Sequence, residues 1–217
     1  MDEFSVIDLK TWDRKENYIW FTTKNNCKIN MTANINITNL LKFMKSKKYR
    51  CYPVFAYIIS NVINRNDEFK MGYDEDNRLG IWKVIHPRYP IFHEEDKKLS
   101  ILWTEYNENF DIFYDNFIFD IEKYGHIRSM AAKGIYPKNC FDITSIPWVS
   151  FTNFTCPNDN FLWFPPFIAV GKFFESDNKK MLPVSVTSHH AVTDGYHVSK
   201  FFIQFQSLVD SFEEWLI

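Results

Sequence analysis

Hydrophobic and polar residues alternate with a period of two in several short runs, a pattern typical of β-strands with one buried face. The clearest runs cover residues 28–37, 89–93, 99–104, 164–174 and 181–187. A weaker alternation over residues 4–9 predicts one more short strand. The polar residues 74–78 separate two apolar stretches and predict a hairpin over residues 71–84, with residues 69–73 leading into its turn.

Other segments repeat their hydrophobic residues every three or four positions, as amphipathic helices do. Residues 52–64 are apolar almost all round and predict a well-buried helix, whereas residues 108–124 carry one broad apolar stripe. Residues 38–47 and 196–217 predict two more helices. The chain therefore combines strands and helices along its whole length.

Composition narrows the class of protein. The 217 residues can bury a sizeable core, and we interpret residues 1–217 as a single domain. Aromatic residues make up 18% of the chain, which favours a deep apolar pocket or an extensive interface. The net charge is −2 with both signs interspersed, so nothing favours nucleic acid or an anionic membrane as a partner.

The N-terminus, the apolar runs and the cysteines bear on where in the cell the protein is located. No apolar run is long enough to span a membrane, and the acidic N-terminus has no apolar signal region. The four cysteines lack the spacing of a zinc site and are expected to be reduced thiols. We therefore expect a cytoplasmic protein without a metal site.

The stretch with the most chemistry is residues 188–195, which reads Ser-His-His-Ala-Val-Thr-Asp-Gly. It lies between a predicted strand and a predicted helix, where side chains can project into a cleft. His190 could act as a general base because the pKa of histidine lies near neutrality. Asp194 could cap the helix or pair with an arginine. A structural role for both histidines is the alternative, and a zinc site is less favoured.

Two further motifs accompany this stretch: Trp-Asp-Arg-Lys-Glu at residues 12–16 and Pro-Trp-Val-Ser-Phe at residues 147–151. Together the three motifs resemble those of the trimeric, type A chloramphenicol acetyltransferases, and the resemblance covers about residues 4–209. The shorter pattern His-His-x-x-x-Asp-Gly is shared with dihydrolipoyl acyltransferases. That role is disfavoured because no lipoyl domain or Pro/Ala-rich linker precedes the motifs.

The resemblance implies an α/β fold of the α+β type, with a mixed β-sheet flanked by helices. It also implies a homotrimer with active sites at the subunit interfaces, chloramphenicol as acceptor and acetyl-CoA as co-substrate, with no permanently bound cofactor. His190 would be the general base for direct attack on the thioester, its other ring nitrogen held by its own backbone carbonyl. Arg14 would pair with Asp194, and His189 would be structural.

Thr144 stands where the family carries a serine that donates to the oxyanion of the tetrahedral intermediate. Ser145 could take this role instead, but adjacent residues of a strand point to opposite faces. A strand threonine chosen for its β-propensity is the competing interpretation.

The resemblance also assigns substrate contacts. The antibiotic pocket would include Trp20, Phe21, Cys27, Leu99, Phe154 and Ala169, and acetyl-CoA would contact Lys172 and Phe173. Phe21 stands where a tyrosine is common, and Ala169 replaces a threonine that helps to bind water. Core packing is the alternative for Trp20, Phe21 and Cys27, and a solvated hairpin lysine for Lys172.

Two other functions stay open. One is an acyltransferase of the same fold with a different acceptor, because several expected pocket residues differ from the family. The other is a non-catalytic protein that binds a hydrophobic ligand. His93 is a weaker active-site candidate, and we expect it to be a surface or hydrogen-bonded histidine of a strand.

Overall fold

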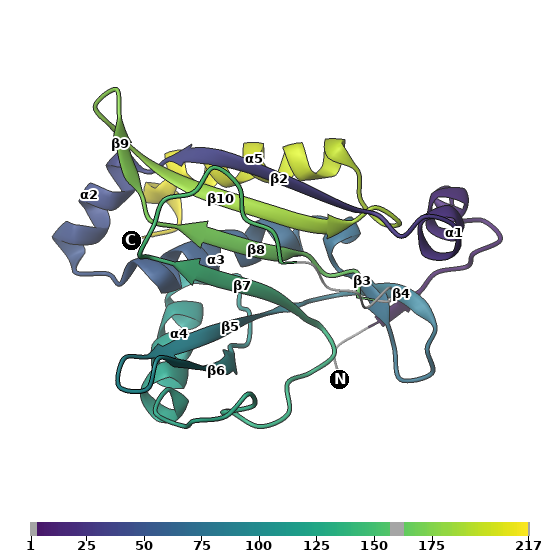
Figure 1. The fold of residues 1–217 in the computed structure, drawn as a ribbon, viewed down its shortest axis with the longest axis horizontal. Helices are drawn as coiled ribbons and strands as arrows, with labels where there is room; N and C mark the ends of the chain where they lie inside the picture. The colour runs from purple at the N-terminus through teal and green to yellow at the C-terminus, as the bar shows by residue number, and fades with distance from the viewer. Residues whose placement is uncertain (1–3, 157–162, 217) are drawn as a thin grey trace.

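The computed structural model describes residues 4–156 and 163–216, and its largest feature is a mixed β-sheet (Figure 1). The strands follow the order β2 (Lys28–Asn36), β10 (Lys179–His189), β8 (Phe167–Gly171), β7 (Cys140–Ile146), β5 (His86–His93) and β6 (Lys98–Trp103). β9 (Phe174–Ser176) also pairs with β10. β7 runs parallel to both β5 and β8, whereas the other pairs are antiparallel. The expected mixed sheet is therefore confirmed.

A smaller sheet joins the N-terminus to the predicted hairpin. It has the order β1 (Phe4–Val6), β4 (Leu79–Trp82) and β3 (Met71–Tyr73). A Cβ atom on Gly80 would lie 2.4 Å from the carbonyl oxygen of Ser5, so this close pairing requires glycine. Phe69, which the alternation placed in a strand, instead ends the 3-10 turn η1 (Asp67–Phe69).

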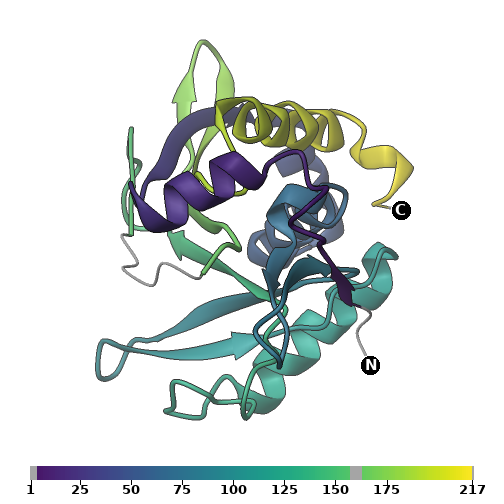
Figure 2. The same ribbon diagram turned by 90° about the vertical axis from the view of Figure 1, so that its right-hand side faces the viewer.

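Four helices lie on one side of the large sheet, as Figure 2 shows. They are α2 (Thr38–Lys47), α3 (Cys51–Asn64), α4 (Phe110–Tyr124) and α5 (Gly195–Asp210), while α1 (Lys15–Thr23) lies near one end of the sheet. α3 is buried along nearly its whole length, as its apolar composition predicted. No helix in the described part of the chain is long and apolar enough to cross a membrane.

The last helix is shorter than predicted. α5 ends at Asp210, a 3-10 turn η2 (Phe212–Glu214) follows, and Ile217 lies outside the described residues. The chain turns back after Asp210, and the indole N–H of Trp215 donates to the carbonyl of Leu208 at 3.0 Å. Phe212 and Leu216 are thereby buried against the core, so helical spacing in this tail reflects burial and not a continuing helix.

The other side of the sheet carries no helix among the described residues and is crossed by the segment of residues 147–156 (Figure 1). Phe151 packs so closely that a Cβ atom on Gly171 would lie 2.7 Å from its ring. Phe154 stacks on Phe167 with ring centroids 6.2 Å apart. This sheet face is therefore partly open, and it carries several of the predicted site residues.

Candidate active site

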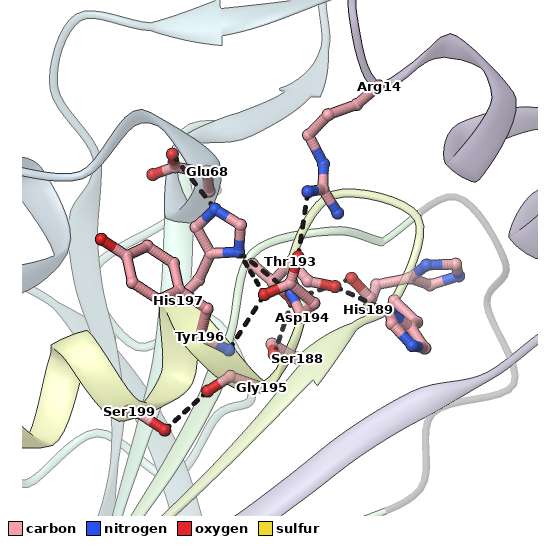
Figure 3. A network of polar contacts seen from close by, with 11 residues as sticks. Arg14, Glu68, Ser188, His189, Thr193, Asp194, Gly195, Tyr196, His197 and Ser199 are labelled. Carbon is pink, nitrogen blue, oxygen red and sulfur yellow. Dashed lines mark hydrogen bonds and ion pairs between the residues drawn. The ribbon is translucent and has the colours of Figure 1, made fainter.

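The two histidines lie where β10 passes into the loop before α5, as predicted. The amides of Val192 and Thr193 both donate to the carbonyl of His189, at 3.2 and 3.1 Å, and close this loop into a tight turn. Asp194 then caps α5, since its Oδ1 accepts from the amide of Tyr196 at 2.9 Å. His197 completes a capping box by accepting from the amide of Asp194, at 3.2 Å (Figure 3).

Arg14, just before α1, reaches the same aspartate. Its Nη1 lies 3.1 Å from Oδ2 of Asp194, so the expected pairing is present together with the helix cap (Figure 3). Burial alone would raise the pKa of Asp194, but the hydrogen bond from Arg14, the nearby His197 and the amide of Tyr196 outweigh it. The pKa of Asp194 therefore lies below its ordinary value. One carboxylate thus ties the N-terminal segment to the end of the histidine loop.

His190 is held by one backbone contact and by two contacts of its imidazole ring. Its backbone amide donates to the carbonyl of Cys27 at 3.0 Å. The Phe21 ring stacks on the imidazole, with centroids 4.0 Å apart and planes 15° from parallel. Nδ1 lies 2.9 Å from the carbonyl oxygen of Thr193. Phe21 therefore contacts the proposed base within one chain.

The partner of Nδ1 corrects one expectation. We expected the ring nitrogen to be held by the carbonyl of His190 itself, and the structure gives this role to Thr193. The reason is the tight turn, which brings the carbonyl of residue 193 back to Nδ1 at the edge of the ring. A carbonyl can only accept, so Nδ1 carries the proton and Nε2 keeps the lone pair that a general base needs.

His189 has the structural role that we expected. It is 1% exposed, its Nδ1 accepts from the amide of Ala191 at 3.1 Å, and its ring packs edge-to-face with Phe164. Burial, followed by the positive charges of Lys28 and His190, lowers the pKa of His189 to about 4. The ring is therefore neutral near pH 7 and cannot replace His190 as a proton acceptor.

Two more predicted residues, Thr144 and Ala169, lie on the open sheet face. Thr144, Ala169, Ser185 and Thr32 form one row, because each is the register partner of the next across β7, β8, β10 and β2. The Ser185 hydroxyl donates to the carbonyl of Phe154 at 2.6 Å, which holds that segment over the row. Ala169 is fully buried between its two hydroxyl-bearing neighbours.

A cavity of about 560 Å³ opens at the carboxyl end of β8, which is the end of the sheet away from the histidine loop. Its lining includes Tyr52, Phe92, Ser145, Trp148, Lys172 and Phe173. Ser145 faces this cavity, and alternation along β7 turns its neighbour Thr144 to the opposite face of the sheet. Sequence reasoning included Lys172 and Phe173 but missed Tyr52 and Trp148. The signal for Trp148 was its place in the Pro-Trp-Val motif.

Of the remaining predicted residues, Cys27 lies beside the histidine loop, where its carbonyl accepts from the amide of His190, whereas Trp20 and Leu99 are exposed. Trp20 is 56% exposed on α1, and Leu99 is 50% exposed on the edge strand β6, at the other side of the sheet from β10. His93 is a buried strand histidine whose Nε2 lies 2.8 Å from the Ser100 hydroxyl, so its bonded-strand interpretation is confirmed. Within the described residues, no three His, Cys, Asp or Glu side chains are placed to hold a metal ion.

Comparison with known proteins decides the family. Residues 2–206 match the chloramphenicol acetyltransferase family. The chain belongs to this family. The chloramphenicol acetyltransferase of Clostridium perfringens is 42% identical over 216 residues, which cover 99% of this chain and 98% of that protein. A Staphylococcus aureus chloramphenicol acetyltransferase is 36% identical over 216 residues, or 98% of this chain and 99% of its own length.

Solved structures agree on the fold of this chloramphenicol acetyltransferase family member. A chloramphenicol acetyltransferase structure superposes with a TM-score of 0.83 at 22% identity, covering 95% of this chain and all of that chain. Dihydrolipoamide acetyltransferase of Azotobacter vinelandii superposes with a TM-score of 0.70 at 16% identity, covering 93% of this chain and 88% of that chain. The second likeness shows that the fold is shared with a neighbouring acyltransferase family.

We expect His189 to make the stability of this family member depend on pH. Its pKa is about 4 in the folded state and near 6.5 when unfolded, so the unfolded chain binds the proton more readily. The stabilisation is complete above pH 6.5 and is lost as the pH falls towards 4. We expect the wild type to lose about 3 kcal/mol more than His189→Asn over this range.

Urea unfolding across this pH range, at one chain concentration, measures the difference. Asparagine does not titrate there and can still accept from the amide of Ala191, so it serves as the matched variant. Parallel pH profiles for the two proteins would contradict the assignment of a buried neutral His189.

Proposed function

We propose that this protein transfers an acetyl group from acetyl-CoA to a hydroxyl of chloramphenicol, and so confers resistance to that antibiotic. The observation that carries the proposal is His190, whose Nδ1 donates to the Thr193 carbonyl at 2.9 Å and leaves Nε2 to accept a proton. Identity of 42% to a chloramphenicol acetyltransferase over nearly the whole chain supports the substrate assignment.

The proposed mechanism follows from the position of the His190 proton on Nδ1. Nε2 of His190 removes the proton of the acceptor hydroxyl as its oxygen attacks the thioester carbonyl, with no acyl-enzyme. The Thr144 hydroxyl donates to the oxyanion of the tetrahedral intermediate. When the intermediate collapses, the imidazolium returns its proton to the departing CoA sulfur. Each turnover therefore yields one acetyl ester and one free thiol and restores neutral His190.

The proposal requires a second subunit. Thr144 lies two strands away from Ser185 in register, and His190 follows Ser185 by five residues. With about 3.3 Å per residue and about 4.8 Å between strands, their Cα atoms are roughly 19 Å apart. Side chains cannot close that distance. We therefore propose a homotrimer in which His190 of one subunit faces Thr144 and the antibiotic pocket of the next.

Acetyl-CoA would enter by the cavity at the carboxyl end of β8. Lys172 offers a positive charge at its lining, and Phe173 and Trp148 offer aromatic surface, which suits a ligand with phosphates and an adenine ring. The cavity side of β7 carries Ser145, so the pantetheine arm would have to pass the end of β7 to bring the thioester to the opposite face, which carries Thr144. Because acetyl-CoA is an intracellular metabolite, we expect a cytoplasmic enzyme.

The Asp194–Arg14 pair has a testable role in this enzyme. Asparagine can still cap α5, so Asp194→Asn chiefly removes the charge that pairs with Arg14. The Nε and Nη2 atoms of Arg14 are buried without a hydrogen-bond partner among the described residues, so its guanidinium would lose its one compensating contact. We expect a loss of about 2 kcal/mol, a Tm lower by on the order of 5 °C, and a lower kcat.

Thermal unfolding and steady-state kinetics of the variant measure both effects. Glu175→Gln is the matched control, because it removes the exposed pair of Glu175 with Lys180 and should change the Tm little. If Asp194→Asn altered neither Tm nor kcat, the pairing would have no role in holding the loop.

Thiol release from acetyl-CoA, with and without chloramphenicol, tests the proposed function on purified protein. Release that depends on chloramphenicol, with acetylated antibiotic as product, supports it. Absence of thiol release by a folded trimer would contradict the proposed function. Chloramphenicol binding by calorimetry in that case would favour a non-catalytic ligand-binding protein instead.

A second candidate function keeps the chemistry and changes the acceptor. The fully buried Ala169 beside Thr144 removes a hydroxyl that the resemblance led us to expect, which favours this alternative. A panel of other hydroxyl acceptors in the same assay distinguishes the two, since a kcat/KM above that for chloramphenicol would establish the alternative.

A further inference from the structure

We propose that Thr193 is the positioning residue of the base, and that its buried hydroxyl fixes the loop whose carbonyl selects the reactive tautomer of His190. This inference deepens the proposed acetyl transfer and rests on it. Thr193 is fully buried, so none of its surface is open to a substrate. It acts through the 2.9 Å contact between its carbonyl oxygen and Nδ1 of His190.

The hydroxyl of Thr193 has two partners in the loop. Its Oγ1 lies 3.0 Å from the carbonyl of His189 and 2.8 Å from the hydroxyl of Ser188. The one hydroxyl hydrogen of Thr193 faces both acceptors, the Ser188 hydroxyl and the His189 carbonyl. The side chain therefore fastens residue 193 to the end of β10 at two points.

Backbone contacts of Thr193 carry the effect of its hydroxyl to the imidazole of His190. The Thr193 amide also donates to the carbonyl of His189, so both the amide and the side chain of residue 193 are bound to that one group. The remaining polar group of Thr193, its carbonyl, is thereby oriented towards the imidazole. Asp194 follows directly and is held by Arg14, which limits movement of the loop from the other end.

The consequence for catalysis is a choice between two tautomers. A neutral imidazole has its proton on Nδ1 or on Nε2, and only the Nδ1-protonated form presents a basic Nε2. A displaced Thr193 carbonyl would hold Nδ1–H less well and would let the ring rotate. Since displacements near 1 Å can lower rates by on the order of a hundredfold, a loosened loop should reduce kcat.

Three variants test the proposal. Thr193→Val keeps the shape and removes the hydroxyl, Thr193→Ala removes it without crowding, and Thr193→Ser keeps it. We expect the valine and alanine variants to lose about ten- to a hundredfold in kcat with KM for both substrates nearly unchanged. Serine should restore kcat to within about threefold, because it donates the same hydrogen bond.

The matched control is Thr104→Val, which removes another fully buried hydroxyl, bonded to Asp120 and Tyr89 far along the chain from the loop. It should lower the Tm while kcat stays near that of the wild type. A kcat loss for Thr193→Val no larger than for Thr104→Val would overturn the proposal, as would equal losses for the alanine and serine variants.

A spectroscopic measurement separates this proposal from the proposed function. In protein labelled with ¹⁵N-histidine, and with the His190 signals assigned by loss in His190→Ala, nitrogen shifts report which ring atom carries the proton. We expect the Nδ1–H form in wild type and Thr193→Ser, and a mixture in Thr193→Ala. Wild-type signals in the alanine variant would refute the inference, even if the protein acetylates nothing.

Discussion

Replacing His190 by alanine is expected to lower the kcat of acetyl transfer by about a hundred- to ten-thousand-fold. The variant loses the group that we propose takes the hydroxyl proton, and the adjacent His189 cannot replace it because it is buried, neutral and already accepts from the amide of Ala191. Structure should change little, since the backbone amide of residue 190 still reaches the Cys27 carbonyl. KM for acetyl-CoA should stay near its wild-type value.

Thiol release at saturating substrates, with gel filtration to confirm the assembly, measures this loss. His126→Ala is the control, because His126 is exposed and lies outside the site. Full activity in His190→Ala would remove the base from the mechanism. A parallel loss in His126→Ala would show that the assay responds to any histidine substitution.

The position of the catalytic loop could be predicted because its signals are local. Alternation ends at the histidines, a glycine follows Asp194, and helical spacing begins at once, so a strand, a turn and a helix must meet there. The two alternatives for Asp194 were both correct. Its two carboxylate oxygens serve different partners, one the helix amide and the other Arg14.

Contacts made by backbone groups could not be predicted in the same way. The Thr193 carbonyl reaches His190 only because two amides and one hydroxyl close the turn, and no residue pattern encodes that closure. The stacking of Phe21 on His190 was missed for a related reason. An aromatic residue on α1 suits a pocket wall or a core equally well, and only the packing of α1 against the loop decides.

Burial explains the other differences. The apolar spacing of the last segment continued past Asp210, but Phe212 is buried by a chain that has already turned back. Spacing records which residues are buried, and a folded-back tail can satisfy the same pattern as a longer helix. The distance between Thr144 and His190 also could not be predicted from the sequence, because it depends on the order and register of the strands.

Removing the hydroxyl of Thr144 is expected to have the second-largest effect. Thr144→Val should lower kcat by on the order of a hundredfold or more, because the oxyanion loses a preorganised donor. Valine has nearly the same shape and suits a strand, so β7 and its register with Ala169 should persist. Thr144→Ser should retain most of the activity, since serine keeps the hydroxyl donor.

Ser145→Ala decides between the two neighbouring hydroxyls. Ser145 lines the cavity proposed for acetyl-CoA and Thr144 faces the other side of the sheet, so alanine at 145 should raise KM for acetyl-CoA and spare kcat. The reverse result, a large kcat loss at 145 with none in Thr144→Val, would transfer the oxyanion role to Ser145. It would also mean that the acetyl group is attacked on the cavity side of β7, and that His190 must approach from there.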